Sequence, residues 1–72
     1  MYNVELLVKN VKTGDICRKE IVKWYSLWGA RCWAREVIEC TDITNVDIID
    51  TETGELMLSL SENGNVEWDS EG

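Results

Sequence analysis

The chain contains no histidine and no proline, and its three cysteines follow no metal-binding or disulfide pattern. Without histidine, the protein cannot form a Ser-His or Cys-His nucleophile pair, and it lacks the commonest general base and a frequent zinc ligand. Cys17, Cys32 and Cys40 are never spaced as Cys-x-x-Cys, so we expect free thiols in the cytoplasm. Cys17 and Cys40 are expected to be small core residues.

Other functional motifs are missing as well. The sequence has neither a glycine-rich phosphate loop nor the alternating aspartates of an EF-hand. Its apolar runs cover only a few residues, far below the roughly 20 that span a bilayer, and the first residues do not resemble a signal peptide. We therefore expect a cytoplasmic protein that is not an enzyme, uses no cofactor, holds no metal ion and binds no membrane.

Charge is plentiful, but it is divided unevenly along the chain. All seven basic residues lie within the first 35 positions, and eleven of the fourteen acidic residues follow from Glu36 onward. Such asymmetry indicates either a charged partner or a soluble protein whose two halves attract each other. Because the net charge is −7, direct binding to nucleic acid is not expected. A local basic patch on the first hairpin stays open as an alternative, formed by Lys9, Lys12, Arg18, Lys19 and Lys23.

Alternation of apolar and polar residues predicts several β-strands. The first covers residues 2–9, and the second covers residues 16–25, whose charged centre suits the edge of a sheet. The other strands are expected at 43–50, around Leu56, Leu58 and Leu60, and at 66–68 after a tight Asn63-Gly64 turn. The turn segments KTGD and TETGE resemble each other, which we interpret as shared turn chemistry rather than a repeat.

One helix is predicted over residues 26–40, beginning at Ser26, whose hydroxyl suits an N-cap. Apolar side chains recur there at helical spacing. The small residues Ala30 and Ala34 would let the helix lie close to a sheet. The tryptophans expected to pack inside the protein, one under the start of the helix and one in the core, are Trp24 and Trp33.

These elements predict the α+β fold class. We expect a single small domain over residues 1–68 with the element order ββαββ(β), in which an antiparallel sheet carries one helix packed on one face. The third strand is expected beside the first, which puts the charged second strand at an edge of the sheet. Residues 69–72 are predicted to form a frayed acidic C-terminal tail.

Trp28 is the residue that points most directly to a binding surface, because helical spacing puts it on the polar side of the helix beside Arg35. An exposed tryptophan near an arginine is typical of a binding hot spot, whereas the alternative is that Trp28 covers an edge of the sheet. Acidic residues also crowd the C-terminal end of the helix, where the macrodipole favours cations. The candidate partner-binding residues are Trp28, Arg35, Glu36, Glu39, Asp42, Asp50, Glu52 and Glu55.

These residues support the hypothesis of a non-enzymatic protein-binding module. Its partner would be a protein with a basic surface. By occupying a nucleic-acid-binding site on a host or defence protein, the module would act as an inhibitor encoded by a phage or mobile element, in the style of anti-CRISPR proteins. Two alternatives stay open: a structural domain that forms a homodimer or larger homo-oligomer, and a sensor of a small ligand or nucleotide.

Overall fold

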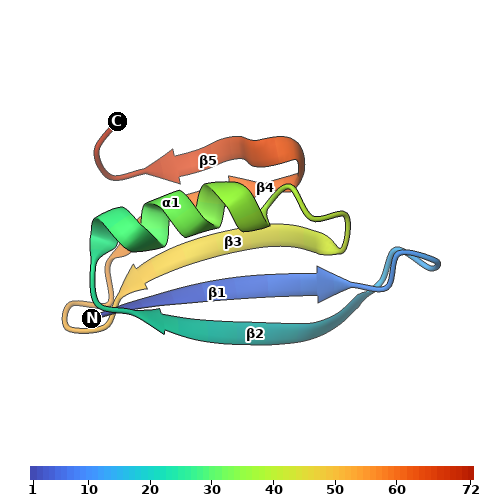
Figure 1. Ribbon diagram of the computed structural model, residues 1–72, viewed down its shortest axis with the longest axis horizontal. Helices are drawn as coiled ribbons and strands as arrows, with labels where there is room; N and C mark the ends of the chain where they lie inside the picture. The colour runs from blue at the N-terminus through green and yellow to red at the C-terminus, as the bar shows by residue number, and fades with distance from the viewer.

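The computed structural model describes residues 1–72 and contains five strands and one α-helix. The strands are β1 (Tyr2–Lys9), β2 (Ile16–Trp24), β3 (Ile43–Asp50), β4 (Leu56–Ser61) and β5 (Asn65–Asp69), and the helix is α1 (Leu27–Val37). A turn of 3-10 helix, η1 (Glu62–Gly64), joins β4 to β5. The strands lie in the order β2-β1-β3-β4-β5, and every neighbouring pair is antiparallel (Figure 1). The predicted α+β class and the pairing of the third strand with the first are confirmed.

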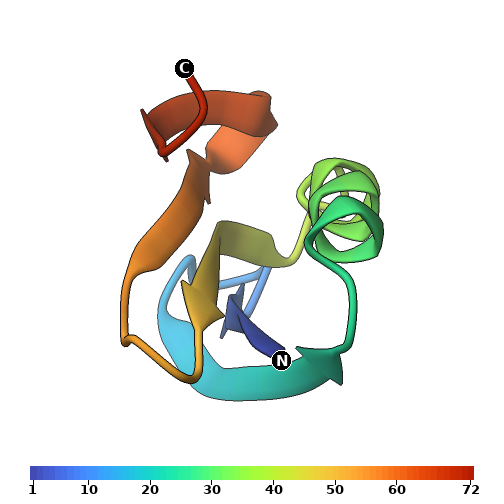
Figure 2. The same ribbon diagram turned by 90° about the vertical axis from the view of Figure 1, so that its left-hand side faces the viewer.

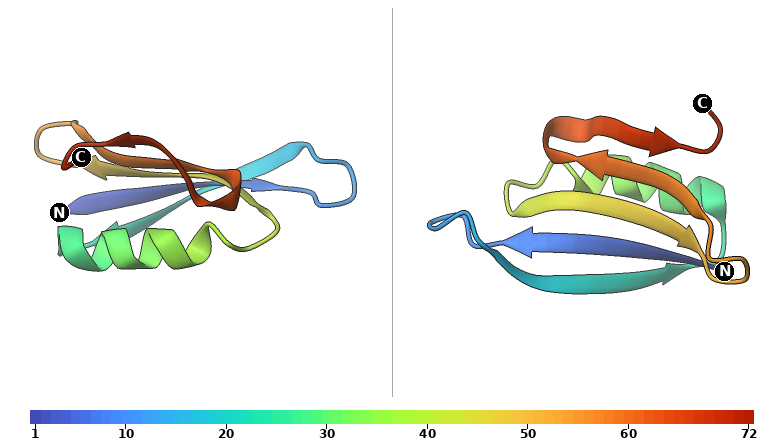
Figure 3. Two further views of the ribbon diagram at one scale, coloured as in Figure 1. Left: turned by 90° about the horizontal axis from the view of Figure 1, so that it is seen from above. Right: turned by 180° about the vertical axis from the view of Figure 1, so that it is seen from behind.

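The helix covers one face of the sheet, and the hydrophobic core lies between them (Figure 2). Because side chains alternate along a strand, every second residue of the central strands points towards α1. Ala30 and Ala34 are completely buried on the helix side, where their small size lets α1 lie close to the strands. The opposite face of the sheet carries no helix (Figure 3). The buried apolar residues are Val4, Leu6, Val8, Ala30, Ala34, Ile38, Ile43, Val46, Ile48, Leu58 and Leu60.

Local hydrogen bonds define where α1 begins and ends. Ser26 Oγ accepts a hydrogen bond from the backbone N–H of Gly29 at 3.3 Å, which confirms the predicted N-cap. The helix ends at Val37 rather than Cys40, because the N–H groups of Glu39 and Cys40 donate to carbonyls three residues earlier and form a tighter turn. With 11 residues, α1 is too short to cross a membrane, and the chain has no longer helix.

Two half-buried tryptophans, Trp24 beneath the start of α1 and Trp33 on α1 itself, pack against each other and against the core. The ring centroids of Trp24 and Trp33 are 5.7 Å apart, and both side chains pack against the core. Gly29 lies so close to the Trp24 ring that a Cβ atom added at this position would be 3.2 Å from ring carbons. The absence of a side chain at Gly29 therefore lets the helix lie directly on the ring.

Two loops, Asn10–Asp15 and Asp50–Glu55, have the same backbone hydrogen bonds. In each loop the glycine N–H donates to the carbonyl of the first residue, at 2.7 Å for Gly14 and at 2.8 Å for Gly54. Both glycines have positive φ, of 79° and 75°, a conformation that other residues adopt only at a cost. The loops lie at opposite ends of the sheet (Figure 1).

The likeness between these hairpins extends beyond turn chemistry into their first strands. Residues 3–7 read NVELL and residues 45–49 read NVDII, and the antiparallel pairing of β1 with β3 sets these two segments against each other. Glu5 lies directly opposite Asp47 at the centre of the pair. The repulsion between these two carboxylates is offset by Lys19, whose Nζ lies 2.6 Å from Glu5 Oε1.

Three residues are not where the sequence pattern predicts them. Cys17 and Cys40 are exposed rather than in the core. Cys17 is the extra residue where the register of β1 with β2 shifts, and Cys40 follows the end of α1. Asp69, predicted to lie in the tail, is the last residue of β5, and Arg31 binds its carboxylate. The fraying of residues 70–72 stays a prediction.

Candidate protein-binding surface

Two aromatic side chains are exposed around the start of α1. Trp28, in the first turn, has 76% of its surface exposed, and Tyr25, between β2 and α1, has 87%. Trp28 therefore does not cover an edge of the sheet; Trp24 and Trp33 pack against the core at this end instead. Tyr25 was not among the predicted residues, although its place directly after the inward-pointing Trp24 indicates an outward side chain.

A hollow of 510 Å³ lies beside Trp28, between α1 and Glu71 near the C-terminus. Arg31 lines it, and Arg31 Nη2 donates to Asp69 Oδ2 at 2.8 Å while Nε lies 3.2 Å from Glu71 Oε2. The hydrogen bond from Arg31, with a second from the backbone N–H of Glu71, holds the pKa of Asp69 below its usual value. The bond to Asp69 also raises the pKa of Arg31. The lining residues are Leu27, Trp28, Arg31, Cys32, Arg35 and Glu71.

The six predicted acidic residues share one property, which is that none of them is in an ion pair. The six ion pairs of the protein engage five of its fourteen carboxylates and five of its seven bases. Four of these pairs join the basic first half to the acidic second half, so attraction between the halves accounts for part of the charge asymmetry. The unpaired acidic residues are Asp15, Glu36, Glu39, Asp42, Asp47, Asp50, Glu52, Glu55 and Glu67.

Arg35, the one basic residue among the candidates, has a single distant partner. Its Nη2 lies 3.9 Å from Asp69 Oδ2, at the limit of an ion pair, and 51% of its side chain is exposed. Asp69 is already bound at 2.8 Å by Arg31, so the interaction of Arg35 with that carboxylate is the weaker of the two. Arg35 therefore remains accessible to a partner at the rim of the hollow.

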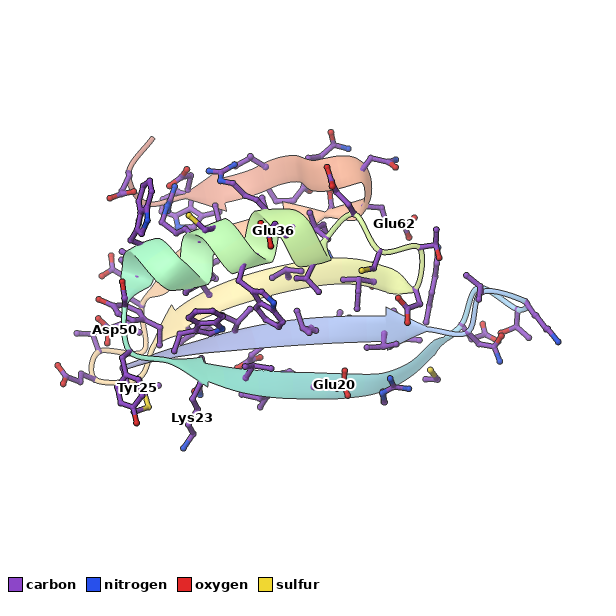
Figure 4. All side chains as sticks on the ribbon, in the orientation of Figure 1. Glu20, Lys23, Tyr25, Glu36, Asp50 and Glu62 are labelled. Atoms are coloured by element: carbon purple, nitrogen blue, oxygen red, sulfur yellow. The ribbon has the colours of Figure 1, made fainter.

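The six candidate carboxylates do not form one continuous patch. The β3–β4 loop carries three of them at the end of the molecule where α1 begins, and the connection from α1 to β3 carries two at the opposite end (Figure 1). Glu36 lies between these groups on α1 (Figure 4). The molecule is 36 Å long but only 21 and 17 Å across, so a single partner can contact the whole of one end. The set at the helix start, called the aromatic–acidic end below, is Tyr25, Trp28, Asp50, Glu52 and Glu55.

The carboxylates of this end are held in different ways. Asp50 Oδ1 accepts a hydrogen bond from the backbone N–H of Glu52 at 2.9 Å, so Asp50 also shapes the loop. The side chains of Glu52 and Glu55 have no hydrogen-bond or ion-pair partner, and both residues are exposed. Glu52 and Glu55 are therefore free to contact another molecule, with Asp50 holding the loop beneath them.

Neither a metal-binding cluster nor a similar protein points to a different site. No three Cys, Asp or Glu side chains come together in a way that could hold a metal ion. A second hollow, of 660 Å³, lies at the C-terminal end of α1 and is bordered by the Lys9–Glu62 ion pair. Comparison of the chain with protein-family models, with curated proteins and with solved structures gave no match. The function is therefore inferred from the exposed surface itself.

Proposed function

We propose that the protein is a non-enzymatic protein-binding module whose aromatic–acidic end attaches to a basic surface of another protein. The observation that carries this proposal is the exposure of Trp28 and Tyr25, 76% and 87%, at the end of the molecule that also holds unpaired carboxylates. Neither Trp28 nor Tyr25 belongs to the hydrophobic core or to the half-buried side chains packed against it. Tryptophan, tyrosine and arginine are the residues most enriched in binding hot spots.

Each group at this end has a separate part in binding. The faces of the Trp28 and Tyr25 rings suit the guanidinium and ammonium groups of a partner, which aromatic rings attract electrostatically. Glu52 and Glu55 would pair with further cations and speed the encounter. Glu36, Glu39 and Asp42 lie outside the contact and add to the negative field that draws a basic partner towards the molecule.

The nucleic-acid-binding sites of proteins are basic surfaces of this kind, because they neutralise phosphates. A module that covers such a site would exclude the nucleic acid and act as an inhibitor. This role fits a small protein that a phage or mobile element directs against a host or defence protein. The same electrostatics makes the association sensitive to salt, since exposed charges are screened over about 8–10 Å at physiological ionic strength.

The proposal is tested by capture of the partner from a lysate of the host cells. The protein is attached to the matrix through the Asn10–Asp15 loop, which lies at the end opposite to the start of α1, where Trp28 is located (Figure 1). We expect a basic protein to be retained by the wild type at low salt and released at high salt. Trp28→Ala should lose this protein, whereas Val66→Ala should retain it, because Val66 is also exposed (51%) but lies in β5. Equal capture by both variants would contradict the proposal.

A further inference from the structure

β2 forms a long free edge of the sheet. It spans nine residues and pairs with β1 alone, and no other segment lies beyond it (Figure 1). Residues 16–23 are all exposed. The outer backbone N–H and C=O groups of an edge strand have no partner in the sheet, so they can pair with another chain.

The charge of this edge is opposite in sign to the net charge of the molecule. β2 carries Arg18, Lys19 and Lys23 against one acidic residue, Glu20, and it is the only strand in which bases outnumber acids. Lys23 takes part in no ion pair and points away from the sheet (Figure 4). The edge therefore presents free positive charge on a protein whose net charge is −7.

β2 also exposes apolar side chains on both faces of the sheet. Val22 lies opposite Val4 on the helix side, and Ile21 lies opposite Glu5 on the open side. Ile21 is 53% exposed and Val22 is 37% exposed. An added strand would cover both side chains, because neighbouring residues of a strand contact opposite faces.

We propose that the β2 edge binds an extended acidic segment of a partner protein, which joins the sheet as a sixth strand. Backbone hydrogen bonds to β2 would hold the segment. Its carboxylates would lie on the open face of the sheet beside Lys23, and its apolar residues would cover Val22 on the helix face. Lysines at an edge repel a second basic strand, so they disfavour pairing of β2 with β2 of another copy while they admit an acidic strand.

The other free edge is less suited to this role. β5 has only five residues, and its pairing with β4 shifts register in the middle of the strand, between Val66 and Trp68, whereas the shift in β2 lies at its start, at Cys17. Short and irregular edge strands resist further pairing. The proposed site is therefore specific to β2, and it does not depend on the function proposed for the aromatic–acidic end.

The test uses a synthetic peptide of about ten residues that alternates glutamate with valine or threonine, long enough to pair with all nine residues of β2. Amide shifts and hydrogen exchange of the whole protein are followed by NMR as the peptide is added. We expect shifts and protection at residues 16–24 and none in β5. A peptide with lysine in place of glutamate should not bind, and a peptide N-methylated at every residue should also fail, because it has no N–H donor on either edge for the backbone hydrogen bonds.

Two variants of the protein, Lys23→Glu and its control Lys12→Glu, change the charge equally but at different places. Lys12 and Lys23 are the two bases without an ion pair, and only Lys23 lies in β2. Lys23→Glu should weaken binding of the peptide about fivefold, whereas Lys12→Glu should leave it unchanged. Equal effects of the two variants, binding of the N-methylated peptide, or shifts centred on β5 or α1 would overturn the proposal. Protection of β2 by self-association without peptide would also overturn it and identify a second copy as the occupant.

Discussion

Arg31 and Asp69, which are separated by 38 positions in the chain, form the hydrogen bond that ties α1 to β5. Their side chains are 12% and 18% exposed, and Arg31 also lies 3.2 Å from Glu71. The C-terminal strand is thereby fixed beside the hollow that Trp28 and Arg35 line. The C-terminal carboxylates of Asp69 and Glu71 are thus paired with a base of the helix, whereas the carboxylates of the β3–β4 loop have no such partner.

The first prediction concerns the pH dependence of this contact. The pKa of Asp69 is lower in the folded protein than its ordinary value near 4, so its stabilising effect is fully present above that value and is lost as pH falls through the folded pKa. Asp69→Asn should lower the melting temperature at neutral pH, and the difference from the wild type should disappear in acid. Thermal melts from pH 7 to about pH 2 measure this. Glu67→Gln, which removes an unpaired carboxylate of the same strand, should have no effect.

The second prediction separates the exposed tryptophan from a packed one. Trp28→Ala should change the free energy of unfolding by less than about 0.5 kcal/mol, because Trp28 is largely exposed and lies outside the core. Trp33→Ala should destabilise the domain by about 3 kcal/mol, since it removes the partner of Trp24 and opens a cavity beside the core. Denaturant unfolding of both variants measures the two values. A large loss of stability in Trp28→Ala would exclude Trp28 as a binding residue.

The third prediction rests on the equivalence of the two loops. Gly14→Ala and Gly54→Ala should each destabilise the protein by about 1 kcal/mol, because alanine is strained at the positive φ of both positions. A Cβ atom added at either position would meet no other atom within 4 Å, so the cost is one of backbone conformation alone and should be equal in the two variants. Chemical unfolding tests this. A clear difference between the two values would show that the loops are not equivalent.

The elements of the fold could be predicted because each leaves a local pattern in the sequence. Alternation identified the strands, and the hydroxyl of Ser26 marked the start of the helix. The errors arose where a single hydrogen bond or an extra residue decides the structure. Cys17 is displaced by a register shift, and Cys40 follows a helix that closes in a tighter turn.

The candidate site was less accessible to sequence reasoning, because it depends on contacts between distant residues. Helical spacing gave the direction of Trp28 around the helix, but not the width of the sheet beneath it, so its exposure could not be decided. The Asn63-Gly64 turn predicted the return of β5 along β4, but the bond from Arg31 to Asp69 also requires α1 to lie beside β5, which no local pattern shows. The one signal in the sequence was the charge distribution: no basic residue follows Arg35, whereas eleven acidic residues do.

The fourth prediction concerns the charges of the aromatic–acidic end. Reversal of Glu52 and Glu55 to lysine should lower the rate of association with the captured basic partner about tenfold at low salt, because exposed charges act mainly on encounter. Added salt should mask the change. Glu67→Lys is the matched control, since Glu67 is also unpaired but lies in β5. Stopped-flow kinetics measures the rates, and an equal effect of Glu67→Lys would mean that only the net charge matters.

The most direct measurement for the proposed function is the affinity of the captured partner for wild type, Trp28→Ala and Val66→Ala by titration calorimetry. Trp28 should anchor the complex, so Trp28→Ala should lose about 2 kcal/mol of binding free energy, roughly a thirtyfold change in Kd. Val66→Ala should bind as the wild type does, because its side chain is exposed outside the contact. Equal affinities for all three proteins would contradict the assignment of the aromatic–acidic end as the binding surface.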